Sequence, residues 1–351
     1  VLRPGESFSS YRVVRCLSSG LLADYYHMQH VRDLRDVTVG VFHPRTRDDP
    51  HCLTRLKELQ QRLQNCSHES IPQIRDCLQI DGQDCIILDP VAGPHLGQYM
   101  QRYAQPDESG VGQEAATEVL ALLLGVLGYA HAQGLQHCDL DSELVFVAED
   151  GSLQILGLGV KAALGVEVFE AIVSSSVSPI GSNASAGRLN SFDIMSPEYR
   201  AGLAEDARVD VYAAGCIGYW LLTGQKAAAG SELESGALPE ELRAGWHKLL
   251  VKMLEREPAK RYPSCKLVLT ALPQLKHAPQ SAQGSVIQRQ IDRIPVPQGI
   301  LSRGTLATRY YRLLLIGVVG LTLTALAASF LRFSMTPTRT YTKLVATVAE
   351  P

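Results

Sequence analysis

Short apolar runs separated by charged and small residues fill the first part of the chain. Three of them, YRVVRCL, ADYYHMQ and DVTVGVF, fall between residues 11 and 48. Their length and alternation predict three short antiparallel strands. Leu then recurs at helical spacing in HCLTRLKELQQRLQ, which predicts a helix. Two more strands are expected in SIPQIRDCLQIDGQDCIILD, on either side of an Asp-Gly turn.

The pattern changes after the Gly/Pro break VAGPHLG. The segment EAATEVLALLLGVLGYAHAQ is apolar almost throughout and predicts a long buried helix, and most of the sequence beyond it also has helical periodicity. We therefore expect a small sheet lobe at residues 8–90 and a larger helical lobe at residues 91–275. Residues 276–312 lack periodicity and are rich in Gln, Pro and Gly, as is typical of a linker.

A charge-free apolar run, LLLIGVVGLTLTALAASFL, covers residues 313–331. As a helix it would span about 28 Å, close to the hydrocarbon thickness of a bilayer. We therefore expect a single transmembrane helix, with residues 276–312 as a juxtamembrane linker and residues 332–351 as a short, truncated tail. Basic residues flank both ends of the run, so charge alone does not orient it. A large domain that carries every cysteine, with no signal peptide before it, favours a cytoplasmic position for residues 8–275.

Composition narrows the function classes. The chain has 351 residues, of which 46% are hydrophobic, enough for two lobes that each bury a core. Lys and Arg number 33 against 36 for Asp and Glu, so no nucleic-acid partner is expected. The eight cysteines form no CxxC pair, which favours reduced, mostly buried thiols over zinc ligands or disulfides.

Two groups of motifs follow the predicted buried helix. HCDL occupies residues 137–140, and SPEYRAG is followed by DARVDVYAAGCIGYWLLTG. With the lobe layout, these motifs resemble the eukaryotic-like Ser/Thr protein kinases of bacteria, many of which carry a cytosolic kinase domain and one transmembrane helix. The resemblance covers about residues 8–275. It implies an α+β, bilobal protein-kinase-like fold, followed here by the linker and the transmembrane helix.

The residues that hold such a fold together are present. By resemblance, Glu198 in SPE pairs with Arg261 in REPAKRYPS. Asp210 opens the central buried helix of the helical lobe and accepts hydrogen bonds from the backbone of the catalytic loop, residues 137–144. His137 and Asp139 match the ends of the His-Arg-Asp motif, so Asp139 stands at the position of the catalytic base.

The residues that handle ATP and Mg²⁺ in the family are mostly replaced. The Gly-rich loop keeps only Gly20, within SSGLLA, and the helix glutamate at Glu58 or a neighbouring position has no lysine partner. The degenerate positions, with the residue that the family has there, are Gly40 (the strand Lys), Asp141 (the loop Lys), Leu144 (the metal-binding Asn) and Gly157 (the Asp of Asp-Phe-Gly).

These losses predict little or no phosphoryl transfer. Catalysis in this family rests on positioning the phosphates and neutralising their charge, and Leu and Gly side chains offer no oxygen to a hard cation. Each lost contribution is worth on the order of 3 kcal/mol. We therefore expect no Mg²⁺, no cofactor, and weak or absent ATP binding, with Asp139 retained for a structural reason.

The adenine side of the cleft keeps its residues. In IILDPVAG, residues 86–93, Leu88 matches the gatekeeper, and the usual adenine contacts come from Asp89 and Val91 on either side of a proline. The hinge is therefore expected to be open to a nucleotide, leaving a residual cleft formed with Gly20. Between Gly157 and Glu198, a Ser/Ala/Gly stretch at residues 174–191 predicts a mobile loop, or alternatively a segment phosphorylated by another kinase.

Three functions remain open. The first is a membrane-anchored pseudokinase that acts as a scaffold or regulator of a protein partner, such as an active kinase. The second is an active ATP-dependent Ser/Thr kinase with a non-standard site, in which Asp139 is the base and Asp141 or Glu143 replaces the metal ligands. The third is a transmembrane receptor whose kinase-like part relays dimerisation.

Overall fold

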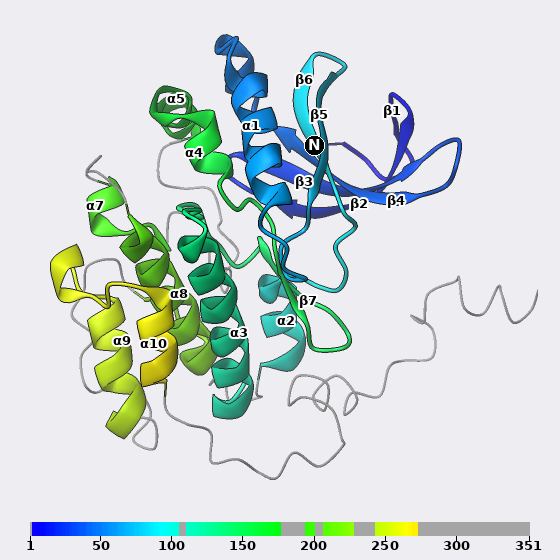
Figure 1. The fold of residues 1–351 in the computed structure, drawn as a ribbon. Coiled ribbons are helices and arrows are strands. Elements are labelled where there is room, and N and C mark those ends of the chain that lie inside the picture. The colour runs from blue at the N-terminus through cyan, green and yellow to red at the C-terminus, as the bar shows by residue number, and fades with distance from the viewer. Residues whose placement is uncertain (1, 105–109, 177–193, 201–205, 228–242, 273–351) are drawn as a thin grey trace, which may run out of the picture. The chain divides into compact units, whose positions relative to one another are not determined.

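The computed structural model describes residues 2–104, 110–176, 194–200, 206–227 and 243–272 (Figure 1). All of them belong to one compact unit. The predicted linker, transmembrane helix and tail lie outside the described residues. Within the described part, one helix is long and apolar enough to cross a membrane, α3 (Gln113–Ala132), and 56% of its most apolar window is buried inside the protein.

The first lobe is built on a six-stranded sheet in the order β1-β2-β3-β4-β6-β5, in which all neighbours are antiparallel. The strands are β1 (Ser7–Phe8), β2 (Tyr11–Ser19), β3 (Ala23–His30), β4 (Asp36–Phe42), β5 (Ile74–Ile80) and β6 (Gln83–Leu88). The five predicted strands are confirmed, and β1 is an addition. The expected Asp-Gly turn is present between β5 and β6, where Asp81 and Gly82 both have positive φ, as a type I′ hairpin turn requires.

Helix α1 (Cys52–Gln64) packs against β5 and follows a short turn, η1 (Pro44–Asp48). Leu56, Leu59 and Leu63 are buried at helical spacing, which is the periodicity that predicts the helix. Glu58 is exposed. Leu59, the next residue, is buried instead, so the face of α1 that turns toward the rest of the protein has an apolar residue at this point.

The second lobe is mainly helical, as the sequence predicts. Its helices are α2 (Leu96–Tyr103), α3, α7 (Pro197–Arg200), α8 (Ala207–Thr223), α9 (Lys248–Met253) and α10 (Cys265–Ala271), with shorter turns η3 (Arg243–His247) and η4 (Pro258–Lys260). Helices α3, α8 and α10 pack on one another. A hairpin of β7 (Val145–Val147) and β8 (Leu153–Ile155) follows the catalytic loop. Its strands of three residues are too short for the pattern to predict.

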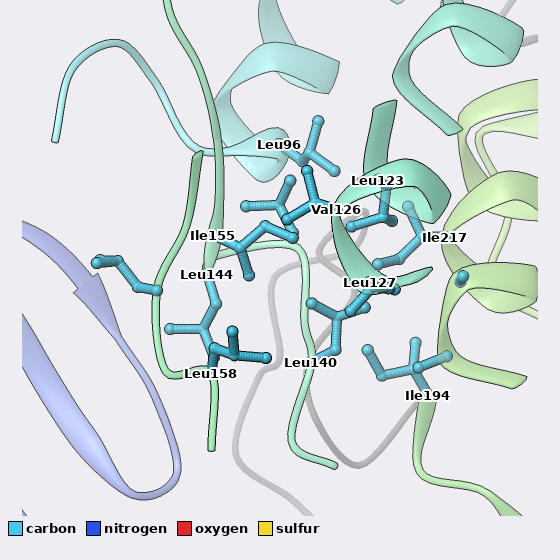
Figure 2. Close-up of a cluster of buried hydrophobic side chains, with 14 of the residues drawn as sticks. Leu96, Leu123, Val126, Leu127, Leu140, Leu144, Ile155, Leu158, Ile194 and Ile217 are labelled. Carbon is cyan, nitrogen blue, oxygen red and sulfur yellow. The ribbon is translucent and has the colours of Figure 1, made fainter. Parts of the chain in front are cut away.

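One hydrophobic cluster ties the catalytic loop to these helices (Figure 2). Leu140 and Leu144 of the loop are buried, and Figure 2 shows them beside side chains of α3 and of the segment after β8. The loop is therefore part of the core, and its backbone is fixed by packing on apolar side chains.

The segment after Gly157 differs from the expectation. It forms α4 (Val160–Leu164) and α5 (Val166–Ser176), so the stretch predicted to be a loop begins, at residues 174–176, as the last turn of a helix. Val168 and Ile172 are buried at i, i+4 spacing, and this apolar stripe explains the helix. Residues 177–193 lie outside the described part.

Candidate functional site

Asp210, in the first turn of α8, lies beneath the catalytic loop. Its two carboxylate oxygens accept the backbone N–H of His137 at 2.9 Å and of Cys138 at 2.8 Å, and His131 Nε2 donates at 2.8 Å. Burial would raise the pKa of Asp210, but the hydrogen bond and charge of His131 outweigh it and lower that pKa. The contacts implied by the resemblance are present.

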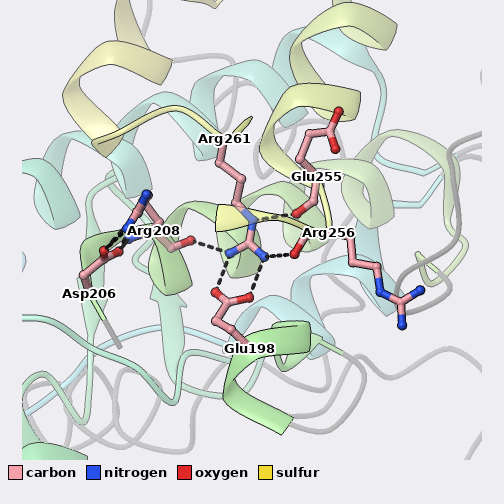
Figure 3. A network of polar contacts seen from close by, with 6 residues as sticks. All are labelled: Glu198, Asp206, Arg208, Glu255, Arg256 and Arg261. Carbon is pink, nitrogen blue, oxygen red and sulfur yellow. Dashed lines mark hydrogen bonds and ion pairs between the residues drawn. The ribbon is translucent and has the colours of Figure 1, made fainter. Parts of the chain in front are cut away.

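Glu198 and Arg261 form a fully buried pair (Figure 3). Both guanidinium Nη atoms lie 2.6 Å from the two carboxylate oxygens, a bidentate arrangement. Arg261 also donates to the carbonyls of Glu255 at 2.7 Å and Arg208 at 3.1 Å. These bonds hold α7, the start of α8 and the segment before η4 together, and they satisfy the charges that burial would otherwise make costly.

The catalytic loop keeps its two matched residues in place. His137 is fully buried and its Nε2 donates to the carbonyl of Leu156 at 2.8 Å. Burial lowers the pKa of His137, so the ring is neutral and its Nδ1 accepts the N–H of Asp139 at 3.4 Å. Cys138 between them has φ of +59°, a backbone region that L-residues seldom adopt.

Asp141 stabilises the loop itself. Its Oδ1 accepts the backbone N–H groups of Glu143 at 2.6 Å and Leu144 at 3.1 Å. This is the local side-chain to backbone bonding that Asp favours in turns. Asp141, which stands where the family has the loop lysine, therefore stabilises a turn of the catalytic loop.

The two matched metal-ligand positions are apolar or bare in the structure. Leu144 is 3% exposed within the hydrophobic cluster, near Leu158 (Figure 2). Gly157 has φ of +86°, and a Cβ there would lie 3.5 Å from the hydroxyl of Tyr25. Within the described ranges, no group of three or more His, Cys, Asp or Glu side chains is arranged to hold a metal ion.

Tyr25 of β3 fills the space beside Gly40, where the family has its lysine. The two residues are directly paired across β3 and β4. A Cβ added to Gly40 would lie 2.9 Å from Tyr25 Cε1 and 3.0 Å from Ile86 Cγ1, closer than ordinary van der Waals contact. Burial, followed by the charges of Asp139 and Asp141, raises the pKa of Tyr25, so a neutral phenol occupies this part of the cleft.

One small cavity lies where the two lobes meet. It lies between Tyr25, Asp139, Leu144 and Gly157, and its free volume is about 10 Å³, roughly what one water molecule needs. As it stands, this space does not hold a phosphate group.

The Gly-rich loop bonds to the protein's own groups. Gly20 N–H donates to the carbonyl of Ala23 at 3.1 Å, and Ser19 N–H points at Glu143 Oε2 at 3.4 Å. In a nucleotide-binding loop such N–H groups face phosphate oxygens. Here the carboxylate of Glu143, in the catalytic loop, lies where a phosphate oxygen would approach the Ser19 N–H.

The hinge is less open than the sequence predicts. Val91 N–H donates to Thr38 Oγ1 at 3.0 Å in a buried hydrogen bond. Asp89 binds Arg75 through both carboxylate oxygens, at 2.6 and 2.9 Å, and Leu88 is buried at the end of β6. The Val91 N–H, which the sequence assigns to adenine by resemblance, is therefore already used inside the protein.

Sequence reasoning missed Tyr25 and Thr38. The signal for Tyr25 was available, because alternation along β3 turns Ala23 and Tyr25 to the same face, opposite Gly40. Thr38 lies two residues before Gly40 and so on the same face of β4. Its bond to Val91 joins residues 53 positions apart, and no local pattern indicates it.

The two-lobed architecture and the buried framework residues Glu198, Asp210 and Arg261 are those of a protein kinase fold, here with an altered nucleotide site. Residues 11–271 match the family model described as Protein kinase domain, and the chain belongs to this family. It is similar to the probable serine/threonine-protein kinase PknB of Lactococcus lactis, at 26% identity over 227 residues, or 64% of this chain and 33% of that protein.

Two mycobacterial proteins are also similar. Serine/threonine-protein kinase PknE of Mycobacterium bovis is 23% identical over 309 residues, which cover 84% of this chain and 51% of that protein. The crystal structure of the Mycobacterium tuberculosis PknI kinase domain aligns with a TM-score of 0.54 at 25% identity, covering 77% of this chain and 98% of that one. The chain thus spans between a third and a half of the curated relatives' length.

Proposed function

We propose that this protein is a catalytically impaired pseudokinase that is anchored in a membrane through residues 313–331 and regulates a protein partner. The observation that carries the proposal is the pairing of Tyr25 with Gly40. The lysine that would position the phosphates is absent, and an aromatic ring fills the space beside it.

The other losses support the same conclusion. Leu144 and Gly157 supply no metal ligand, and Asp141 has a negative charge where the family has a positive one. If each contribution is worth on the order of 3 kcal/mol, the loss of all of them leaves almost no catalysis. Asp139 survives inside a loop that Asp210 and Asp141 hold in shape, and a structural role is enough to explain it.

A protein partner fits this state. A kinase fold without phosphoryl transfer can still present its helical lobe and its α4–α5 segment as surfaces, although a fold alone does not name a function. The relatives are named as Ser/Thr protein kinases, and an active kinase in the same membrane is the partner class that we favour.

The rival function is an active kinase with a non-standard site. One observation favours it: Asp139 lines the small cavity between the lobes. In that case Tyr25 must move aside when a nucleotide binds, and the cations around the triphosphate must come from elsewhere.

The two functions differ in a binding and transfer experiment on the full chain in detergent. Thermal unfolding is followed with ATP, with and without Mg²⁺, beside a radiolabelled phosphate-transfer assay on a generic protein substrate. An active bacterial Ser/Thr kinase serves as the positive control. The pseudokinase proposal predicts no Mg²⁺-dependent rise in the melting temperature and no transfer. A Mg²⁺-dependent rise, with transfer that Asp139→Asn abolishes, would establish the rival.

A further inference from the structure

Helices α4 and α5 lie between the two lobes. Figure 1 shows them next to α1 and above α7 and α8, and α4 packs on α1 while α5 packs on η1. Leu164 and Ile172 are fully buried. Both side chains belong to a hydrophobic cluster that also contains residues of the first and the second lobe.

On the side of the first lobe, Arg55 of α1 binds the end of α4. Its Nε donates to the carbonyl of Ala163 at 2.6 Å, and its Nη2 donates to the carbonyl of Leu164 and to the carboxylate of Asp49. The last carbonyls of a helix have no partner within the helix, and a cation at this end is favourable. Arg55 therefore acts as a C-terminal cap supplied by another helix.

On the side of the second lobe, Lys161 of α4 binds α7. Its ammonium lies 3.4 Å from the centre of the Tyr199 ring and 4.7 Å from that of Phe169 in α5. The two rings are themselves 5.2 Å apart. A buried cation over an aromatic face is a stronger contact than an exposed one. Tyr199 follows Glu198, whose bonds to Arg261 fix α7 to the lobe beneath.

We infer that α4 and α5 form a brace that locks the two lobes together, with Arg55 and Lys161 as its two attachments. One attachment ends on α1 and the other on α7, so the cleft cannot widen without breaking at least one of them. Leu59 of α1 also lies close against the residue that precedes α4, since a Cβ added at Gly159 would come within 2.7 Å of its Cδ1. This inference concerns how the lobes are held, and it is independent of whether the protein transfers phosphate.

Hydrogen–deuterium exchange on the full chain in detergent tests the first attachment. Arg55→Ala is expected to raise the exchange rate of residues 160–176 at least tenfold, because it uncaps α4. Arg62→Ala is the matched control: Arg62 lies on the same helix and donates to the carbonyl of Gly134 at 2.9 Å. Its exchange over residues 160–176 should stay within twofold of the wild type.

The second attachment is tested from the opposite lobe. Lys161→Met keeps the aliphatic length and removes the cation, and it is expected to raise exchange in α5 and also in the first turn of α1. Lys252→Met is its control, since Lys252 lies 4.3 Å over the Tyr262 ring away from the brace. An unchanged rate in Arg55→Ala, or no effect of Lys161→Met on α1, would overturn the brace. So would an equal rise in α3 and α8, because the residue would then stabilise the whole fold.

Discussion

The framework beneath the catalytic loop keeps the residues of the kinase family, whereas the cleft above the loop has lost most of them. In the framework, Glu198, Asp210 and Arg261 are all present, buried and hydrogen-bonded. In the cleft, Gly40 and Leu144 have replaced groups that the family uses on the nucleotide. The two regions meet at the catalytic loop, whose backbone is held by Asp210 and which contains Leu144.

The difference separates two kinds of requirement. The framework groups are buried polar side chains, and removing one partner leaves the other uncompensated in a low-dielectric interior. The nucleotide groups carry no such penalty, because their partners are a ligand and its metal ions. Their replacement by apolar residues lets Leu144 join the core (Figure 2). Replacement of the family's ligand-binding residues therefore leaves the fold intact and can even add packing.

The largest expected effect comes from breaking the framework at Arg261. Arg261→Ala leaves Glu198 buried without its partner and leaves the carbonyls of Glu255 and Arg208 without a donor. We expect the free energy of unfolding to fall by about 3–5 kcal/mol. Denaturant unfolding of the full chain in detergent, followed by tryptophan fluorescence, measures this change.

Arg208→Ala is the matched control. Arg208 pairs with Asp206 at a site where both side chains are partly exposed, and such pairs contribute about 0–1 kcal/mol. If both substitutions cost the same, burial does not explain the retention of the framework. The contrast between framework and cleft would then need another cause.

The second effect concerns the cleft. Gly40→Lys restores the family's residue, yet its Cβ would meet the Tyr25 ring at 2.9 Å. We expect it to lower the free energy of unfolding by about 1–3 kcal/mol, as overpacking does, and to give no ATP binding. In the double variant Tyr25→Val with Gly40→Lys, the lysine stem takes the space of the ring. Its loss of unfolding free energy should therefore be smaller than the sum of the losses in the two single variants.

Thermal unfolding of the two single variants and the double variant measures this coupling. Additive changes would show that the ring and the position 40 side chain do not compete for one space. A gain of Mg²⁺-dependent ATP binding in Gly40→Lys alone would show that Tyr25 moves aside readily. Either result would weaken the contrast between a closed cleft and a preserved framework.

The sequence predicts the framework better than the cleft for a physical reason. Strands β2 to β6, helix α1 and the Asp-Gly turn follow from local periodicity and turn chemistry, and Glu198 and Arg261 follow from motifs with strong resemblance. The ring of Tyr25, by contrast, occupies a space defined by two strands and the opposite lobe. Thr38 and Val91 meet across 53 residues, which no local pattern encodes.

Helices α4 and α5 do not follow from the sequence for a related reason. The small residues at 174–191 indicate a loop, whereas Val168 and Ile172 are buried by packing against the rest of the protein. Tertiary packing stabilises most short helices in proteins. The caps that Arg55 supplies to α4 come from 108 and 109 residues away, so the sequence near α4 does not contain them.

The smallest expected effect is at the hinge. Thr38→Val preserves the shape of the side chain and removes the hydroxyl that accepts Val91 N–H. We expect the free energy of unfolding to fall by about 1 kcal/mol, with faster exchange of the Val91 amide.

Thr38→Ser is the control, because it keeps the hydroxyl and loses only a methyl group. It should lower stability through packing while the amide stays protected. Equal protection of the amide in both variants would mean that the bond to Thr38 is not what holds the Val91 N–H. The hinge would then owe nothing to Thr38, and the closure of the cleft would rest on Tyr25.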